Sequence, residues 1–174
     1  MTDGVRQDPV AYPQVGLTGP AAGLIADLNS ISRDLYFAGV AASRYADAAA
    51  DDDVSADDQV IRQALWNAAA ISYRRAFGTG RGLIAEKGSR VRLDDRFVAT
   101  LSEDHRLVHR QVLEMANQHV AHRVGEHEGA AVVAVLALPP ADREIVAVGT
   151  LSVHMVGPTP EVAAGLSEIC TRFM

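Results

Sequence analysis

The sequence predicts a mainly α protein: a bundle of long helices with a C-terminal β-hairpin and a short final helix. Apolar residues recur every three or four positions along most of residues 20–122, which is the period of an amphipathic helix. Two valine-rich runs follow, within residues 130–155, and a loop sequence separates them as in a hairpin. The chain has 174 residues, enough for one domain with a hydrophobic core. We expect that domain over residues 20–174, after an N-terminal tail or arm over residues 1–19.

The first two helices are marked by the residues at which they begin. Pro20 suits the first turn of a helix over residues 20–49. Its apolar face recurs at threes and fours, as Leu24, Leu28, Ile31, Leu35, Ala38 and Ala42. After an acidic break, Ser55 with Asp58 resembles a capping box for a second helix over residues 56–77. The apolar face expected for this helix consists of Val60, Ala64, Trp66, Ala70 and Tyr73.

A third helical stretch is expected from about residue 94 to residue 122, with a break near Ser102, which could serve as an N-cap. A glycine-rich loop over residues 78–93 precedes it. The hairpin strands are expected over residues 131–138 and 144–155. Thr159 as a cap and Pro160 in the first turn predict the final helix.

Composition restricts the classes of function. The net charge is −6 and the pI is about 5.4, which argues against a protein that coats nucleic acid. Cys170 is the only cysteine, so the chain forms no internal disulfide and no cysteine metal cluster. We see no signal peptide, and the longest apolar run, residues 130–138, is too short to span a bilayer as a helix. We therefore expect a cytoplasmic protein that does not act in a membrane.

The third helical stretch carries several histidines on one face, together with apolar residues. At 100° per residue, this face holds His105, His109, Val112, Ala116 and His119, with His122 at its edge. The histidines could be hydrogen-bonded core residues, metal ligands or acid/base groups. His105 with His109 and His119 with His122 have spacings that suit chelation, but ten residues, about 15 Å along a helix, separate the two pairs, so one ion cannot bind both. We therefore expect no metal and no cofactor.

Acid/base chemistry is a further interpretation of the helix end. His122 could take a proton from a ribose 2′-hydroxyl, and Asn117 could position a phosphate or hydroxyl. Arg75, from the second helix, could stabilise charge in the transition state. Further arginines that could bind RNA phosphates are Arg74, Arg110 and Arg123.

Two stretches and the hairpin that follows them resemble a known family. "ALWNAAAISYRRAFGTGR" and "HRLVHRQVLEMANQHVAHRV" resemble the HEPN-like helical domains of prokaryotes, over about residues 61–155. The resemblance implies a dimeric helical bundle and a metal-independent endoribonuclease. It also implies a setting in toxin–antitoxin, abortive-infection or CRISPR-associated systems. The family motif is arginine, a polar residue, about four further residues and histidine; Asn117, Ala121 and His122 match it, but Ala116 replaces the arginine.

The resemblance leads to an RNA-directed function, either a ribonuclease or a degenerate relative kept for RNA binding, in phage defence or a toxin–antitoxin pair. The partners expected are RNA, an antitoxin or other protein, and a second copy of the chain. The homodimer is also expected because Trp66 and Tyr73 would add aromatic surface to the apolar stripe of the third helix. The alternative is a non-enzymatic dimeric interaction or structural protein, such as a phage-related factor.

Overall fold

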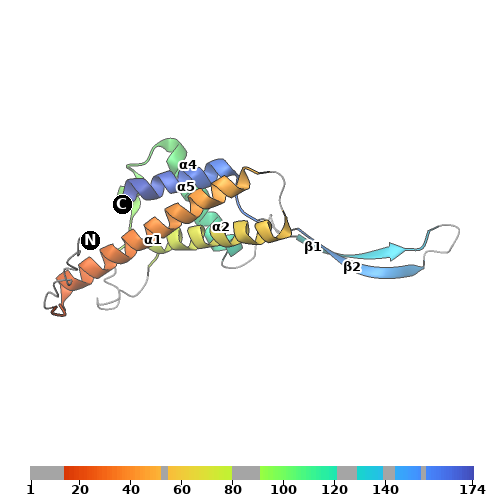
Figure 1. Cartoon of the computed structure of the whole chain (residues 1–174), viewed down its shortest axis with the longest axis horizontal. Coiled ribbons are helices and arrows are strands. Elements are labelled where there is room, and N and C mark those ends of the chain that lie inside the picture. The colour runs from red at the N-terminus through yellow and green to blue at the C-terminus, as the bar shows by residue number, and fades with distance from the viewer. Residues whose placement is uncertain (1–13, 52–54, 80–90, 121–128, 139–143, 154–155) are drawn as a thin grey trace, which may run out of the picture.

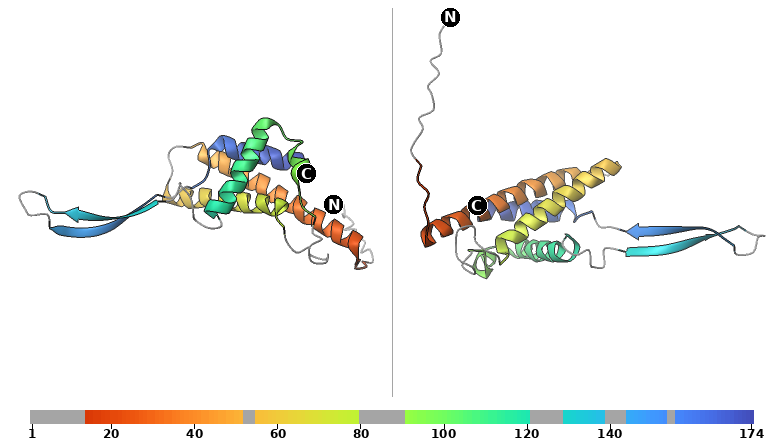
Figure 2. Two further views of the ribbon diagram at one scale, coloured as in Figure 1. Left: turned by 180° about the vertical axis from the view of Figure 1, so that it is seen from behind. Right: turned by 90° about the horizontal axis from the view of Figure 1, so that it is seen from below.

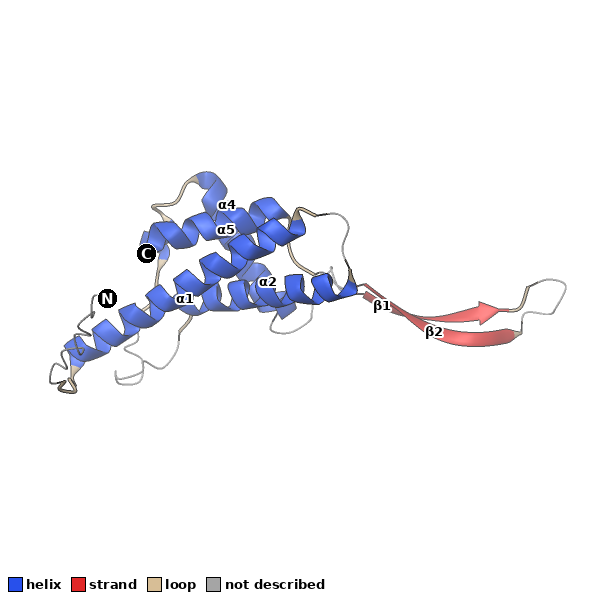
Figure 3. Ribbon diagram, in the orientation of Figure 1, coloured by secondary structure: helices blue, strands red, loops and turns tan. Residues whose placement is uncertain are grey.

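A helical bundle and a hairpin make up the structure. The computed structural model describes residues 14–51, 55–79, 91–120, 129–138, 144–153 and 156–174. The helical elements are α1 (Pro20–Ala49), α2 (Ala56–Phe77), α3 (Asp95–Val98), α4 (Glu103–Met115), the π-helical turn η1 (Ala116–Val120) and α5 (Pro160–Phe173). Strands β1 (Gly129–Leu136) and β2 (Ile145–Val153) form an antiparallel hairpin, which extends away from the helices (Figure 1). The predicted fold class is confirmed (Figure 3).

Helix α1 is the central element of the bundle, with α2 and α5 both packed along it. Gly19 precedes it with a φ of 94°, a conformation that favours glycine, and Pro20 occupies the first turn as predicted. Its buried side chains include Ile31, Leu35, Ala38, Ala42 and Tyr45. The prediction that Leu24 and Leu28 belong to this face is wrong, since they are 46% and 50% exposed. They lie on the first turns of α1, beyond the stretch of the helix that carries the core.

Helix α2 begins at the predicted capping box. The Ser55 hydroxyl accepts the Asp58 backbone N–H, and the Asp58 carboxylate accepts the Ser55 backbone N–H. Its buried face is Trp66, Ala69, Ala70, Ser72, Tyr73 and Ala76. The prediction that Val60 and Ala64 share this face is wrong, because both are exposed. At 100° per residue, Val60 lies 120° and Ala64 160° around the helix from Trp66.

The helical stretch predicted over residues 94–122 is divided into three pieces. Asp94 caps the short α3, and the chain then turns before Ser102. Ser102 is the N-cap of α4, as predicted, and its hydroxyl accepts the His105 backbone N–H. The last turn widens into the π-helix η1, which packs against α2.

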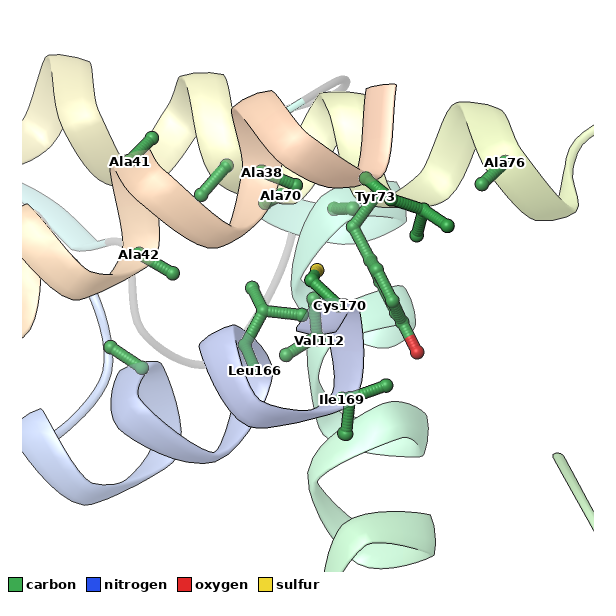
Figure 4. Packing of buried hydrophobic residues seen from close by; sticks show 14 of the residues in the cluster. Ala38, Ala41, Ala42, Ala70, Tyr73, Ala76, Val112, Leu166, Ile169 and Cys170 are labelled. Atoms are coloured by element: carbon green, nitrogen blue, oxygen red, sulfur yellow. The ribbon is translucent and has the colours of Figure 1, made fainter. Parts of the chain in front are cut away.

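Small residues allow the helices to approach closely. A Cβ added at Gly39 of α1 would lie 3.1 Å from the Cys170 Cβ of α5, and one at Gly165 would lie 3.1 Å from Val108 of α4. Figure 4 shows the resulting core, in which alanines of α1 and α2 lie on one side of Leu166, Val112 and Cys170. Trp66 and Tyr73 are 2% and 0% exposed, so the single chain already covers the aromatic surface that we expected to drive dimerisation.

The hairpin returns to the bundle through residues 156–159, where it makes a specific contact. The Tyr45 hydroxyl donates to the Pro158 carbonyl over 2.7 Å. The ring of Tyr45 lies so close to Gly157 that an added Cβ would be 2.6 Å from the hydroxyl oxygen. In all three views the strands point away from the helices (Figures 1 and 2). Thr159 and Pro160 then start α5 as predicted.

Candidate functional site

The hairpin exposes a large apolar surface. Neither β1 nor β2 contains a charged residue, and each of the large apolar side chains named below is between 46% and 75% exposed. They are Val132, Val135, Leu136, Ile145, Val146, Val148 and Leu151. Contiguous exposed apolar surface of this kind is typical of an interaction site.

The strand register shows that both faces of the hairpin are mainly apolar. On one face Ala131 pairs with Leu151, Val133 with Gly149 and Val135 with Ala147. The opposite face contains Val132, Val148 and two hydroxyl residues, Thr150 and Ser152. An antiparallel sheet with one face in water would alternate apolar and polar residues. Within the described residues β1 and β2 form the whole sheet, so each strand also has an open edge.

A second apolar surface lies between α1 and α2. It is a groove of about 330 Å³, lined by Phe37, Val40, Ala41 and Arg44 of α1 and by Ile61, Ala64, Leu65 and Ala68 of α2. Phe37, Val40 and Ile61 are 53%, 44% and 55% exposed, although they are large and apolar. Arg44 is the only charged residue among these lining residues.

The three predicted catalytic residues do not lie together in the described structure. Asn117 and Arg75 lie in different places, and His122 lies outside the described residues. Asn117 lies in η1 and is exposed, whereas the neighbouring Ala116 is fully buried. π-Helical turns occur frequently at functional sites. His122 and Arg123 follow η1 directly in the sequence and lie outside the described residues.

Arg75 lies against α1. Its Nε is 3.5 Å from the Asp34 Oδ2, and the two residues line an open groove of about 870 Å³ together with Ser72 and Met174. Asn117 does not line this groove, so the structure groups Arg75 with Asp34 rather than with the predicted active centre. The predicted RNA-binding residues Arg74 and Arg110 are both exposed.

Two of the histidines have structural partners. His109 is buried, and its Nδ1 lies 2.8 Å from the Tyr73 hydroxyl oxygen. The ring of Phe77 packs on it at 4.8 Å. Burial is the main cause that lowers the pKa of His109, and the charge of Arg110 adds to it. His109 is therefore a neutral core histidine, the first of the three interpretations.

His105 joins two helices at the surface of the bundle. Its Nε2 lies 3.0 Å from the Glu168 Oε2, and so connects α4 to α5. Among the described residues, no cluster of three histidine, cysteine, aspartate or glutamate side chains could hold a metal ion. Each of these two histidines thus has a partner in the packing of the bundle.

The two apolar surfaces were not predicted from the sequence as functional features. Their signals were present: the strands lack the polar alternation of a half-exposed hairpin, and Phe37, Val40 and Ile61 fall outside the predicted core stripes. In the described part of the chain, no helix is both long and apolar enough to cross a membrane. Comparisons of the chain with protein-family models, curated proteins and solved structures find no match.

Proposed function

We propose that this chain is a non-enzymatic interaction protein that assembles through its β-hairpin. The observation that carries the proposal is the exposure of the uncharged strands β1 and β2, whose outer edges pair with no other strand in the described part of the chain. An isolated two-stranded hairpin is at best marginally stable in water, so the strands gain stability when another surface covers them.

The size of the hairpin supports this function energetically. Strands of eight and nine residues span about 27 Å, so each face measures roughly 27 Å by 10 Å. Covering both faces would remove roughly 500 Å² from water and contribute roughly 10 kcal/mol before the costs of association. That gross gain is of the same size as those costs, so a stable complex also needs the apolar area that the partner surface buries.

Hydrogen exchange together with light scattering tests the proposal. In an assembly, we expect the β1 and β2 amides to be protected and the protection to fall on dilution. The double variant V135E/V148E should lose this protection and the associated mass while the helices keep theirs. If the variant and the original chain agree in mass and in hairpin protection at every concentration, the proposal fails.

An RNA-directed function is the second candidate, and the π-helical turn favours it. η1 exposes Asn117 at the start of the segment that resembles the HEPN motif, and Arg110 is exposed on α4. In this candidate His122 acts as the acid/base group, Asn117 positions the RNA and arginines bind phosphate. Arg75 would act there only if it left Asp34.

RNA cleavage by the purified chain tests this second function. We expect His122→Ala to abolish cleavage without unfolding the protein, and Arg110→Ala to weaken RNA binding in a gel-shift assay. A chelator should leave cleavage unchanged, since the proposed chemistry uses no metal. RNA that stays intact at all protein concentrations rules out the enzyme, and the absence of a gel shift rules out RNA binding.

A further inference from the structure

We infer that the hairpin of one copy of this chain docks on the α1–α2 groove of a second copy, in a reciprocal two-fold dimer. The inference rests on the proposed function, because it names the partner of the same hairpin. The partner is a second copy because each chain carries both an exposed apolar hairpin and an exposed apolar groove. Within one chain, these two surfaces do not contact each other.

In the structure, the hairpin does not cover the groove of its own chain. The groove lies between α1 and α2 along the bundle, whereas the strands extend away from the bundle in every view (Figures 1 and 2). A second copy can supply the hairpin that covers this groove. In a two-fold arrangement each copy gives one hairpin and receives one, so the contact closes at two chains.

The chemistry of the two surfaces favours one face of the hairpin. The face with Ala131, Val133 and Leu151 has no polar side chain among its paired residues. The groove offers Phe37, Val40 and Ile61 and a single charge, on Arg44. We therefore place this face on the groove and leave the face with Thr150 and Ser152 outward, where hydroxyls can bind water.

The dimensions of the hairpin and the groove fit a weak, reversible contact. The groove spans residues 37–44 of α1 and residues 61–68 of α2, about 12 Å of each helix. A hairpin of about 27 Å is longer than the groove and covers its whole length. Over the length of the two grooves, two exchanged arms bury roughly 500 Å² in total, which is the size range of weak, transient interfaces.

Light scattering on matched variants tests the groove first. Ile61→Glu places a charge in the groove, and we expect it to weaken dimerisation at least about tenfold. Val60→Glu is the control: it makes the same kind of change on an exposed neighbour that does not line the groove. Circular dichroism should show both variants folded, and Val60→Glu should stay dimeric.

A second pair of variants, again one test and one control, tests the hairpin. Val135→Glu lies on the face assigned to the groove and should dissociate the dimer, whereas Thr150→Glu lies on the opposite face and should leave it intact. If Val135→Glu dissociates the assembly but Ile61→Glu and Val60→Glu behave alike, the groove is not the partner and the proposed function stands. If Val135→Glu also has no effect, both the inference and the proposed function fail.

Disulfide trapping tests the contact directly. A mixture of the variants Ala64→Cys and Val135→Cys should form an inter-chain disulfide under mild oxidation, and neither variant alone should do so. Cys170 is buried and is the only natural cysteine, so it does not compete. A Val135→Cys variant that links only to itself would show hairpin–hairpin pairing and overturn the inference, as would a monomer mass at every protein concentration.

Discussion

The bundle and the hairpin contain the same types of apolar residue, but the bundle buries them and the hairpin exposes them. Val112 of α4 is 0% exposed, and Val148 of β2 is 67% exposed. The bundle closes its core with its own helices, whereas the hairpin has no cover among the described residues. The bundle therefore buries, fully or in part, most of its large apolar side chains, whereas the strands leave most of theirs exposed.

The largest expected effect comes from the same substitution made in both regions. Val112→Ala should lower the free energy of unfolding by about 2–3 kcal/mol, because it removes two buried methyl groups and leaves a cavity. Val148→Ala should change it by less than about 0.5 kcal/mol, since the side chain is exposed. Urea unfolding at low protein concentration, where the chain is monomeric, measures both. Equal losses in the two variants would contradict the comparison.

The junction of the two regions gives the next largest effect. Gly157→Ala would place a Cβ 2.6 Å from the Tyr45 hydroxyl oxygen, so the ring must move and its hydrogen bond to Pro158 weakens. We expect a loss of about 2 kcal/mol in the free energy of unfolding.

A glycine inside the hairpin is the control for this substitution. A Cβ at Gly149 would lie 4.0 Å from Val133, an ordinary contact. Gly149→Ala should therefore leave the thermal stability of the bundle unchanged, with both variants measured by circular dichroism. A Gly157→Ala variant as stable as the original chain would show that the hairpin is not anchored at Tyr45.

Local chemistry made the helix starts predictable, but long-range packing did not follow from the sequence. Pro20, Ser55 and Ser102 act within their own turns, so their caps could be read from neighbouring residues. The exposure of Val60 depends on which side of α2 receives a neighbour. A hydrophobic period alone does not give that side.

The candidate site was harder to predict for the same reason. Arg75 meets Asp34, a residue of another helix, and no spacing in the sequence indicates this ion pair. The sequence left the role of His109 open between a core residue and a group with a chemical function, and Tyr73 and Phe77 around it place it in the core. The hairpin was predicted as secondary structure, but the absence of a cover for it appears only in three dimensions.

Acidification gives the smallest expected effect on stability. It should destabilise the bundle, which buries a titratable histidine, and not the strands, which have no titratable group. β1 and β2 contain none, whereas the bundle buries His109 against Tyr73, with Arg110 and Asp95 as the charges that act on it. Burial raises the pKa of Tyr73, so its hydroxyl stays protonated and can donate to the neutral imidazole. Among the described core residues, His109 is thus the group through which a change between pH 7.5 and pH 5.5 acts.

The direction follows from the lowered pKa of His109 in the folded chain. As the pH falls through about 6.5, the unfolded chain takes up the proton first, and protonation then favours unfolding. The stability that the neutral histidine contributes is present above that pH and declines below it, by at most about 1.4 kcal/mol per pH unit. Chemical denaturation across this range should show the decline in the original chain and in His105→Gln, which leaves His109 in place. In His109→Gln the curve should be flat, and an unchanged slope there would assign the pH dependence to another group.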